Sequence, residues 1–265
     1  MNGALSEGDI DVVVPCRNAP GVLWLTLTHL WCHNRPRSVT LLDNASDALG
    51  MPEVLAWARA RGALVIRHEQ NVGVWASANR GLIVARSRYV MLLSSDLLLG
   101  PGAVAKLAVA AQQTGFPLVG PQVIVEAPAG VGCGHLLIST VAQLRVLEGL
   151  YNGSCWLLDW SRLREAVGWF DERFFICFGD TDYIERMGQA GERFGVVEGV
   201  PSIHLDKQSR RQDFDEEADS RVEMADAAAF ATKWAEHPDV LDRHGQTTSV
   251  QFLLTKGNWG ERITL

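Results

Sequence analysis

Four short apolar runs, each separated from the next by a segment long enough for one helix, constrain the fold more than any other feature of the sequence. The runs lie at residues 10–15, 39–42, 64–66 and 89–93. The segments between them predict helices at 22–31, 54–60 and 74–85, the first two entered through Pro20 and Pro52. Right-handed crossovers place such strands parallel, and runs that are apolar on both faces are typical of a sheet covered by helices on both sides. We therefore expect an α/β protein with a doubly wound, mostly parallel central sheet.

The amino-acid composition of the chain changes beyond its first hundred residues. Pro101 opens another predicted helix, to about residue 113, and a further strand is predicted at 118–125. Residues 126–150 are rich in Gly and Ala, whereas residues 153–199 are dense in aromatic and charged side chains. Within 213–237, an amphipathic helix is predicted from the spacing of Met224, Ala228, Ala231 and Trp234. We expect one domain over residues 1–212 and a helical extension over 213–265.

Composition excludes several classes of protein. The formal net charge is −7 and the basic residues do not cluster, so a surface that coats nucleic acid is not expected. The most apolar stretch, residues 89–99, is interrupted by polar residues and is far below the roughly 20 residues of a membrane span. The first ten residues lack the basic region of a secretory signal, and the 5 cysteines form no CxxC pair, so we expect reduced thiols and no zinc site. These features predict a cytoplasmic location.

Polar residues follow three of the four apolar runs. They are Pro15, Arg17 and Asn18 after the first, Asp43, Asn44, Ser46 and Asp47 after the second, and Ser94, Ser95 and Asp96 after the fourth. Each alone can be a turn former or a helix cap. Because an open α/β sheet binds its ligand outside the carboxyl ends of its strands, the three sets together favour a ligand site there.

Four sequence blocks carry a resemblance to a known family. They are VVVPCRN at 12–18, LLDNASD at 41–47, NVGVWASANRGLIVARSRYVMLLSSD at 71–96 and VGWFDERFFICFGDTDYIERMGQAG at 167–191. In this order they resemble the inverting, GT-A fold glycosyltransferases of family 2, a group that includes rhamnosyltransferase-like enzymes, over about residues 10–210. The resemblance implies a donor half at about 10–125 and an acceptor half at about 126–212.

The resemblance assigns a nucleotide to the strand ends. The residues that it implies as nucleotide-binding are Pro15, Arg17, Asn18, Asp43, Asn79, Ser95 and Asp96. A carboxylate such as Asp43 can accept hydrogen bonds from a base N–H or from ribose hydroxyls, and it can equally anchor an Asx turn. Asn71, Gly73 and Gly81 share a motif with Asn79, and packing alone can explain the two glycines.

A divalent cation, Mn²⁺ or Mg²⁺, is the cofactor that the resemblance implies. Asp96 ends the segment that matches the family's DxD-type motif, and His204 stands where the family often completes the metal site. Ser94 replaces the first acid of the motif, which leaves open whether the metal is required. His204 can also be an ordinary satisfied imidazole, and Lys207 and Arg210 after it are candidate diphosphate clamps.

The catalytic base implied by the resemblance is Asp180, which would take the proton of an acceptor hydroxyl. Gly179 departs from the acidic residue usual before this base. Asp180 can also be the N-cap of a helix over 181–190, with both roles compatible. Gly153, Ser154, Trp156 and Asp182 are expected on the acceptor side, whereas Trp169 and Phe170 are expected in the core.

Two functions of different classes follow. The first is an inverting transferase that moves a hexose or deoxyhexose from a nucleotide diphosphate sugar to a hydroxyl on a small molecule, glycan, protein or modified base. The second, favoured by Ser94 and Gly179, is a non-catalytic sugar-nucleotide-binding or scaffolding protein with a degenerate site. A dinucleotide-dependent oxidoreductase is disfavoured because no GxGxxG follows the first strand. The sequence also allows a homodimer formed through the C-terminal helix.

Overall fold

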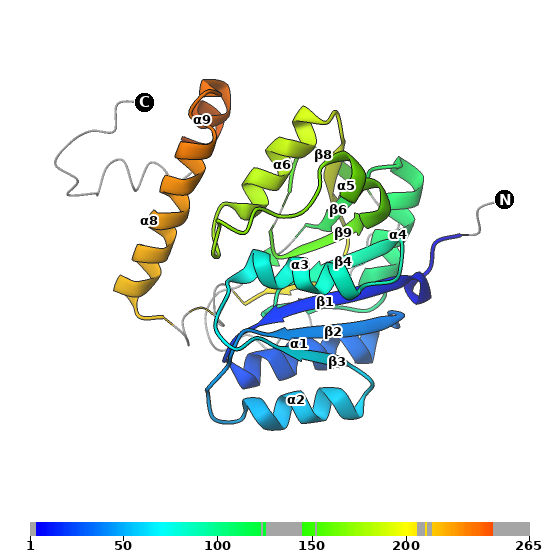
Figure 1. The fold of residues 1–265 in the computed structure, drawn as a ribbon. Coiled ribbons are helices and arrows are strands. Elements are labelled where there is room, and N and C mark those ends of the chain that lie inside the picture. Colours follow the sequence, from blue (N-terminus) through cyan, green and yellow to red (C-terminus); the bar gives the residue numbers. More distant parts are fainter. Residues whose placement is uncertain are drawn as a thin grey trace.

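A computed structural model of the chain describes residues 4–122, 124–125, 145–151, 153–205, 210 and 214–245. Helices surround a central sheet, as the sequence predicts for an α/β protein (Figure 1). The elements in chain order are η1 (Glu7–Asp9), β1 (Ile10–Cys16), α1 (Pro20–His33), β2 (Ser38–Asp43), α2 (Met51–Ala60), β3 (Leu64–Arg67), α3 (Val74–Val84), β4 (Tyr89–Leu93), β5 (Leu97–Leu99), α4 (Ala103–Thr114), β6 (Leu118–Pro121), β7 (Ile124–Val125), β8 (Arg145–Glu148), β9 (Cys155–Asp159), α5 (Trp160–Ala166), α6 (Gly179–Gln189), β10 (Phe194–Glu198), β11 (Ser202–His204), α8 (Glu216–Lys233) and α9 (Pro238–Gly245).

The central sheet has 8 strands in the order β3-β2-β1-β4-β9-β6-β10-β8. The first four strands of the chain are parallel neighbours, which confirms the predicted βαβ arrangement. β9 lies antiparallel between β4 and β6, so it starts at the edge where β4 ends, with Leu93 opposite Cys155. A second sheet has 3 strands in the order β5-β11-β7. Its first strand in the chain, β5, follows β4 directly.

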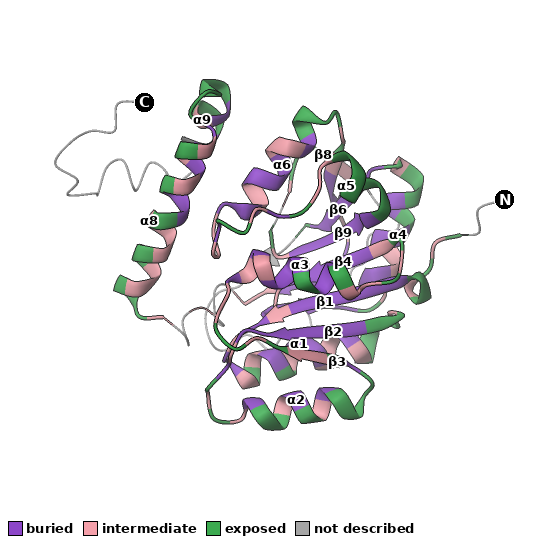
Figure 2. Cartoon of the chain, viewed as in Figure 1, coloured by how far each residue is buried: buried purple, intermediate pink, exposed green. Residues whose placement is uncertain are grey.

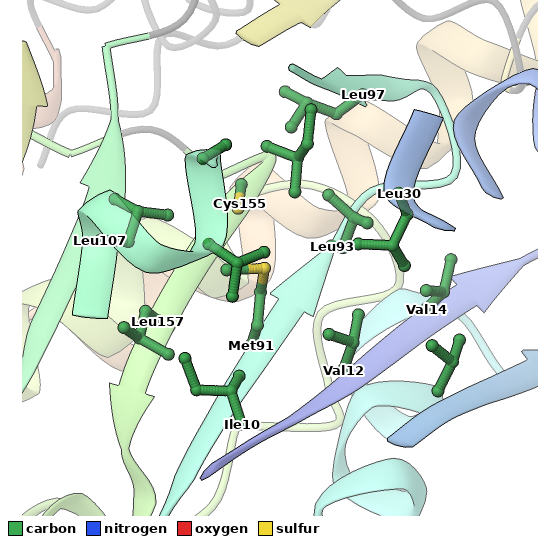
Figure 3. Packing of buried hydrophobic residues seen from close by; sticks show 14 of the residues in the cluster. Ile10, Val12, Val14, Leu30, Met91, Leu93, Leu97, Leu107, Cys155 and Leu157 are labelled. Carbon is green, nitrogen blue, oxygen red and sulfur yellow. The ribbon is translucent and has the colours of Figure 1, made fainter. Parts of the chain in front are cut away.

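Both faces of the inner strands β1, β4 and β9 are buried, whereas the edge strand β3 is partly exposed (Figure 2). Successive residues of β1 point to opposite faces, so Val12 and Val14 pack with α1, α2 and α4, whereas Val13 packs with α3, α5 and α6. Figure 3 shows the first of these layers, in which Ile10, Met91 and Leu157 from three adjacent strands meet Leu30 and Leu107 from the helices. Each such side chain contributes roughly 1.5–3 kcal/mol of burial free energy, and this layer holds the strand ends in fixed positions.

The predicted elements that lie in the described residues agree with the structure except at two places. The strand expected at 118–125 is divided between β6 of the central sheet and β7 of the second sheet. The helix expected at 181–190 starts at Gly179. Most of the segment 126–150, where the predicted acceptor half begins, lies outside the described residues.

The C-terminal helix α8 buries a different face from the one predicted. Trp234 is buried as expected, but Ala228 is exposed, and the other buried residues are Asp226, Ala227 and Phe230. The prediction rested on the spacing of apolar residues. The buried face instead contains the carboxylate of Asp226, which accepts hydrogen bonds from three backbone N–H groups at residues 175–177. This face packs on the chain itself, beside α6 (Figure 1), and a homodimer through α8 stays a prediction.

No helix in the described part of the chain is both long and apolar enough to cross a membrane. Of the described cysteines, Cys16 and Cys155 are buried, Cys177 is partly buried and Cys32 is exposed, all as free thiols. Cys133 lies outside the described residues.

Candidate functional site

A cavity of about 420 Å³ lies at the carboxyl ends of β1, β2 and β4, where the polar strand ends predict a ligand site. The N-terminal part of α3, the first turn of α6 and the end of β11 complete its wall. The cavity therefore brings together residues from both halves of the sequence. The predicted site residues in its wall are Pro15, Arg17, Ser95, Asp96, Gly153, Ser154, Trp156, Asp180 and His204.

Asp96 and His204 form a pair in the cavity wall although 108 positions separate them in the chain. The Nε2 atom of His204 lies 3.2 Å from Oδ1 of Asp96, which also accepts a hydrogen bond from the Ser94 hydroxyl. The pairing of β11 with β5 brings the two together, because Leu205 N donates to the Asp96 carbonyl at 2.9 Å. Asp96 is buried, whereas the side chain of His204 is 22% exposed.

The donor set of this pair fits a divalent cation that receives further ligands from a substrate. A carboxylate oxygen and an imidazole nitrogen are ligands that Mn²⁺ accepts, and diphosphate oxygens and water can complete its coordination. Among the described residues, no three His, Cys, Asp or Glu side chains gather into a metal-binding cluster. A cation at this place would therefore depend on the nucleotide for its remaining ligands.

Asp180 lies in the first turn of α6 and its side chain faces the cavity. Its Oδ1 accepts a hydrogen bond from Thr181 N at 2.9 Å. A Cβ at Gly153 would overlap Oδ2 of Asp180, so the small residue predicted on the acceptor side leaves the room that this carboxylate occupies. The alternative role of Asp180 as a helix N-cap is wrong, because Phe178 holds that position.

The surroundings of Asp180 oppose its ionisation. Burial raises the pKa of its carboxyl above the usual value, and the hydrogen bonds from Thr181 and the charge of His244 only partly offset this effect. Tyr151, whose hydroxyl lies 3.0 Å from Thr181 Oγ1, has its pKa raised to about 12 by burial and then by the charge of Asp180. A carboxyl with a raised pKa beside a cavity is typical of a general base or acid.

Gly179 leaves room for an aromatic side chain that the sequence analysis did not include in the site. A Cβ at Gly179 would overlap the indole of Trp75, which lies in the cavity wall and donates from Nε1 to the Ile176 carbonyl at 2.9 Å. Trp75 thus occupies the space that a larger residue 179 would need. The sequence carries no local signal for this contact, because 104 positions separate Trp75 from Gly179.

Arg17 and Arg210 supply the guanidinium groups of the cavity wall. Arg17 Nη1 donates to the carbonyls of Asn44 and Ala45, each at 2.7 Å, which fixes the β1 and β2 ends together. Arg210 forms an ion pair with Asp219 of α8. Lys207, the other predicted clamp, lies outside the described residues.

Asn18 and Asp43, predicted to bind nucleotide, are not in the cavity wall. Oδ1 of Asn18 accepts from Asp47 N at 2.9 Å, so the amide organises the loop after β2. Asp43 is fully buried, pairs with Arg67 of β3 and accepts from Ser46 N at 3.0 Å. Sequence reasoning missed Arg67, which the parallel register of β2 and β3 places opposite Asp43. The turn-anchoring alternative describes Asp43 in this structure.

Asn79, also predicted to bind nucleotide, lies away from the cavity wall. Its side chain exchanges two 3.0 Å hydrogen bonds with the Phe170 backbone, and its Nδ2 also donates to Glu172 at 2.8 Å. The amide therefore joins α3 to the segment before α6. This contact gives a structural reason for an Asn inside a helix.

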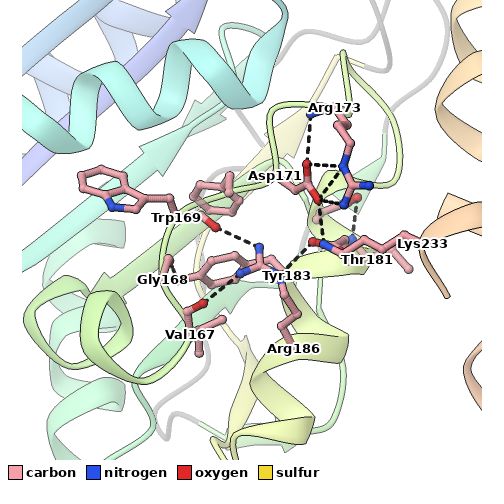
Figure 4. Close-up of polar contacts among 12 residues, drawn as sticks. Val167, Gly168, Trp169, Asp171, Arg173, Thr181, Tyr183, Arg186 and Lys233 are labelled. Carbon is pink, nitrogen blue, oxygen red and sulfur yellow. Dashed lines mark hydrogen bonds and ion pairs between the residues drawn. The ribbon is translucent and has the colours of Figure 1, made fainter. Parts of the chain in front are cut away.

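Asp182, expected on the acceptor side, is a residue of α6 and is fully buried. It pairs with Arg186 at 2.9 Å and with Lys233 at 2.6 Å, and it accepts from Trp234 Nε1 at 3.1 Å. Figure 4 shows how Arg186 also binds backbone carbonyls of the preceding loop while Lys233 of α8 reaches Asp171. The Asp182 carboxylate therefore binds two cations and one indole N–H, and it joins α6 to the C-terminal end of α8.

The aromatic residues near the site divide between core and surface. Trp156 and Phe170 stack at 6.0 Å between ring centroids and both are buried, as expected for Phe170. Trp156 also reaches the cavity wall, and its Nε1 has no hydrogen-bond partner among the described residues. The prediction of a core position for Trp169 is wrong, because the residue is 41% exposed, with its ring edge-on to Trp160.

Comparison with known proteins gives one family and one set of similar folds. Residues 11–171 match the family described as "Glycosyl transferase family 2". S. aureus TarS 1–349 superimposes with a TM-score of 0.63 at 13% identity, covering 95% of this chain and 76% of that one. For its complex with UDP-GlcNAc the TM-score is 0.65 at 15% identity, with 95% and 77% covered.

The longer S. aureus TarS chain also matches, with a TM-score of 0.65 and 15% identity over 95% of this chain. This chain spans 46% of that TarS chain. At such low identity, the likeness shows a shared fold and not a shared substrate. No curated protein matches the sequence.

Proposed function

The chain belongs to glycosyl transferase family 2 and has the GT-A fold, and from this premise we propose that it transfers a sugar from a nucleotide diphosphate to a hydroxyl acceptor with inversion. The observation that carries the proposal is that Asp180, Asp96 and His204 all lie in the wall of the same cavity. One proton acceptor and one cation-binding pair are the groups that such a displacement needs.

In the proposed mechanism, Asp180 accepts the proton of the acceptor hydroxyl as the hydroxyl oxygen attacks the anomeric carbon. The bond from that carbon to the diphosphate breaks on the opposite side, which inverts the configuration, and the nucleoside diphosphate leaves. Asp96 and His204 would hold a divalent cation that neutralises the charge of the departing diphosphate. Arg210 lies in the same wall, where its charge is paired with Asp219 of α8.

We assign the donor to the β1, β2 and β4 side of the cavity and the acceptor to the side of Gly153, Ser154 and Trp156. Pro15, Arg17 and Ser95 at the strand ends support this division, because they lie at the edge where open α/β sheets bind nucleotides. S. aureus TarS has been solved with UDP and with UDP-GlcNAc. Uridine nucleotides are therefore the first donors to test, and no acceptor is singled out by the cavity.

Metal-dependent binding of a nucleoside diphosphate is the first expected result. With UDP, GDP, CDP or dTDP each tested with Mn²⁺, Mg²⁺ or EDTA, one nucleotide should raise the melting temperature only when metal is present. A ligand at 100 times its Kd stabilises the native state by about 2.7 kcal/mol. Asp96→Ala should abolish this shift, whereas Asp47→Ala, which removes an exposed carboxylate outside the cavity wall, should retain it.

A shift that persists in EDTA would retain nucleotide binding and contradict the cation role of Asp96 and His204. No shift with any of the four nucleotides would contradict the proposed donor class.

The rate of transfer should depend on pH through Asp180. Because burial raises its pKa, the carboxyl is protonated up to a higher pH than an ordinary aspartate and cannot act as a base there. We expect kcat/KM, measured as nucleoside diphosphate released from the donor, to fall as pH decreases through this raised pKa and to level off above it. In Asp180→Asn the residual rate should lack this acid limb, and an unchanged limb would assign it to another group.

A further inference from the structure

We propose that Asp226 of α8 is a positioning residue for Asp180, because its carboxylate holds the loop that leads into the first turn of α6. The inference rests on the proposed function and extends it to the C-terminal helix, which lies outside residues 11–171. It gives this helix a part in the reaction without any contact to the substrate.

Asp226 binds three consecutive backbone N–H groups. Its Oδ1 accepts from Phe175 N at 2.8 Å, and its Oδ2 accepts from Ile176 N at 2.8 Å and from Cys177 N at 2.7 Å. The residue is 2% exposed. Hydrogen bonds to an ionised acceptor are about twice as strong as neutral ones, and three successive N–H groups on one carboxylate leave the loop little freedom.

The carbonyl groups of the same loop are bound from the opposite side by α3. Val74 N donates to the Phe175 carbonyl at 2.7 Å, and Trp75 Nε1 donates to the Ile176 carbonyl at 2.9 Å. Val74, Trp75 and Ile176 all lie in the cavity wall. The loop is thus held between the helix beside the strand ends and the C-terminal helix, and Asp226 supplies the whole of the contact from α8 to its N–H groups.

This loop determines where α6 begins. Phe178, the N-cap, has a φ of 61°, a left-handed conformation that is unfavourable for a bulky residue. Its ring packs on Phe230 of α8 at 5.4 Å between centroids, one turn after Asp226. Asp180 follows two residues later. A loop released from α8 would allow Phe178 to relax and would move the carboxylate of Asp180, and a misplacement of 1 Å can cost about 10²-fold in rate.

A merely structural role for α8 predicts a different result, and the chain offers a control for it. Val240 of α9 is 2% exposed and packs in the same apolar cluster as Phe230, but it has no hydrogen bond to the loop. Val240→Ala therefore weakens the docking of the C-terminal helices while leaving the Asp226 contacts intact. Asp226→Asn keeps the shape of the side chain but directs an amide NH₂ at one or more N–H donors.

The experiment compares these variants in the full chain. With the sugar nucleotide that the wild-type protein cleaves fastest among UDP-Glc, UDP-GlcNAc, UDP-Gal and GDP-Man, kcat for nucleoside diphosphate release should fall about 10²-fold in Asp226→Asn. The KM for the donor should change less than twofold, because the strand ends are untouched. Val240→Ala should lower the melting temperature and leave kcat within twofold of wild type. Amide hydrogen exchange at Phe175, Ile176 and Cys177 should accelerate only in Asp226→Asn.

Each other outcome decides against a named claim. No release by the wild-type protein from any of these donors would overturn the proposed transfer and the positioning role with it. Wild-type turnover in Asp226→Asn, or equal losses in Asp226→Asn and Val240→Ala that follow their melting temperatures, would overturn the positioning role alone. If Asp226→Asn does not fold, Asp226→Glu takes its place. Asp226→Glu retains the charge on a longer side chain, so its kcat should lie below that of the wild-type protein. Where some Asp226→Asn protein folds, the kcat of Asp226→Glu should lie between the values of Asp226→Asn and wild type.

Discussion

Replacing Asp180 by asparagine is expected to lower the rate of sugar transfer by about 10²–10⁴-fold, the usual contribution of a positioned general base. The amide cannot take the proton of the acceptor hydroxyl, while its size and shape leave the cavity unchanged. The same substitution should raise the melting temperature at neutral pH, because burial disfavours the ionised carboxylate and an amide does not incur that cost. The measurements are donor cleavage and thermal unfolding of the same preparation.

Asp182→Asn is the matched control, two residues along the same helix. Asp182 is paired with Arg186 and Lys233, so its replacement by a neutral amide removes a buried charge partner from both cations and should lower the melting temperature. A higher melting temperature in Asp180→Asn and a lower one in Asp182→Asn would distinguish a carboxylate that burial destabilises from one that ion pairs stabilise. Full turnover in Asp180→Asn would contradict the catalytic role and favour the alternative of a sugar-nucleotide-binding or scaffolding protein.

Gly73→Ala should be the most destabilising single substitution at the site, by about 3 kcal/mol. Gly73 has φ 85° and ψ 174°, a region that only glycine occupies readily, and an added Cβ would overlap the Phe175 carbonyl oxygen. The overlap also displaces the loop before α6, so nucleotide-dependent stabilisation and turnover should fall together. Denaturant unfolding with and without nucleotide measures both effects.

Gly62→Ala measures the cost of a positive φ without a steric overlap at the added Cβ. Gly62 has φ 87° but no atom lies within 4 Å of an added Cβ, so only the conformational cost of about 1 kcal/mol applies. Equal losses of stability in the two variants would contradict the close approach of Gly73 to Phe175.

The sequence predicts most of the sheet because its signals are local. The apolar runs that become β1, β2 and β4 are continuous, and the helices between them begin near Pro20 and Pro52 as expected. The strand at 118–125 was predicted as one element because its apolar residues are contiguous, although they pair with different sheets. Periodicity also misplaced the buried face of α8, since a polar residue, Asp226, lies at its centre.

Site residues were predictable from the sequence where the course of the backbone alone places them at the cavity. Arg17 and Asp96 come directly after parallel strands, so their presence in the cavity wall follows from topology. Asp43 comes after a strand too, but Arg67 binds it from the neighbouring strand, and one sequence carries no signal for that pairing. Trp75 was missed for the same reason, because its contact with Gly179 joins two segments that are 104 positions apart (179 − 75).

The sequence by itself determined the parallel βαβ order, the edge of the sheet at which polar groups gather and the family to which the chain belongs. These follow from the local period of apolar residues and from motifs whose residues are contiguous in the chain. Only the tertiary structure decided which carboxylates face the cavity and which are neutralised by a partner, as the contrast between Asp180 and Asp182 shows. The physical reason is that the state of a carboxylate depends on burial and on charges brought from distant segments, such as Lys233 of α8, and those contacts exist only after folding.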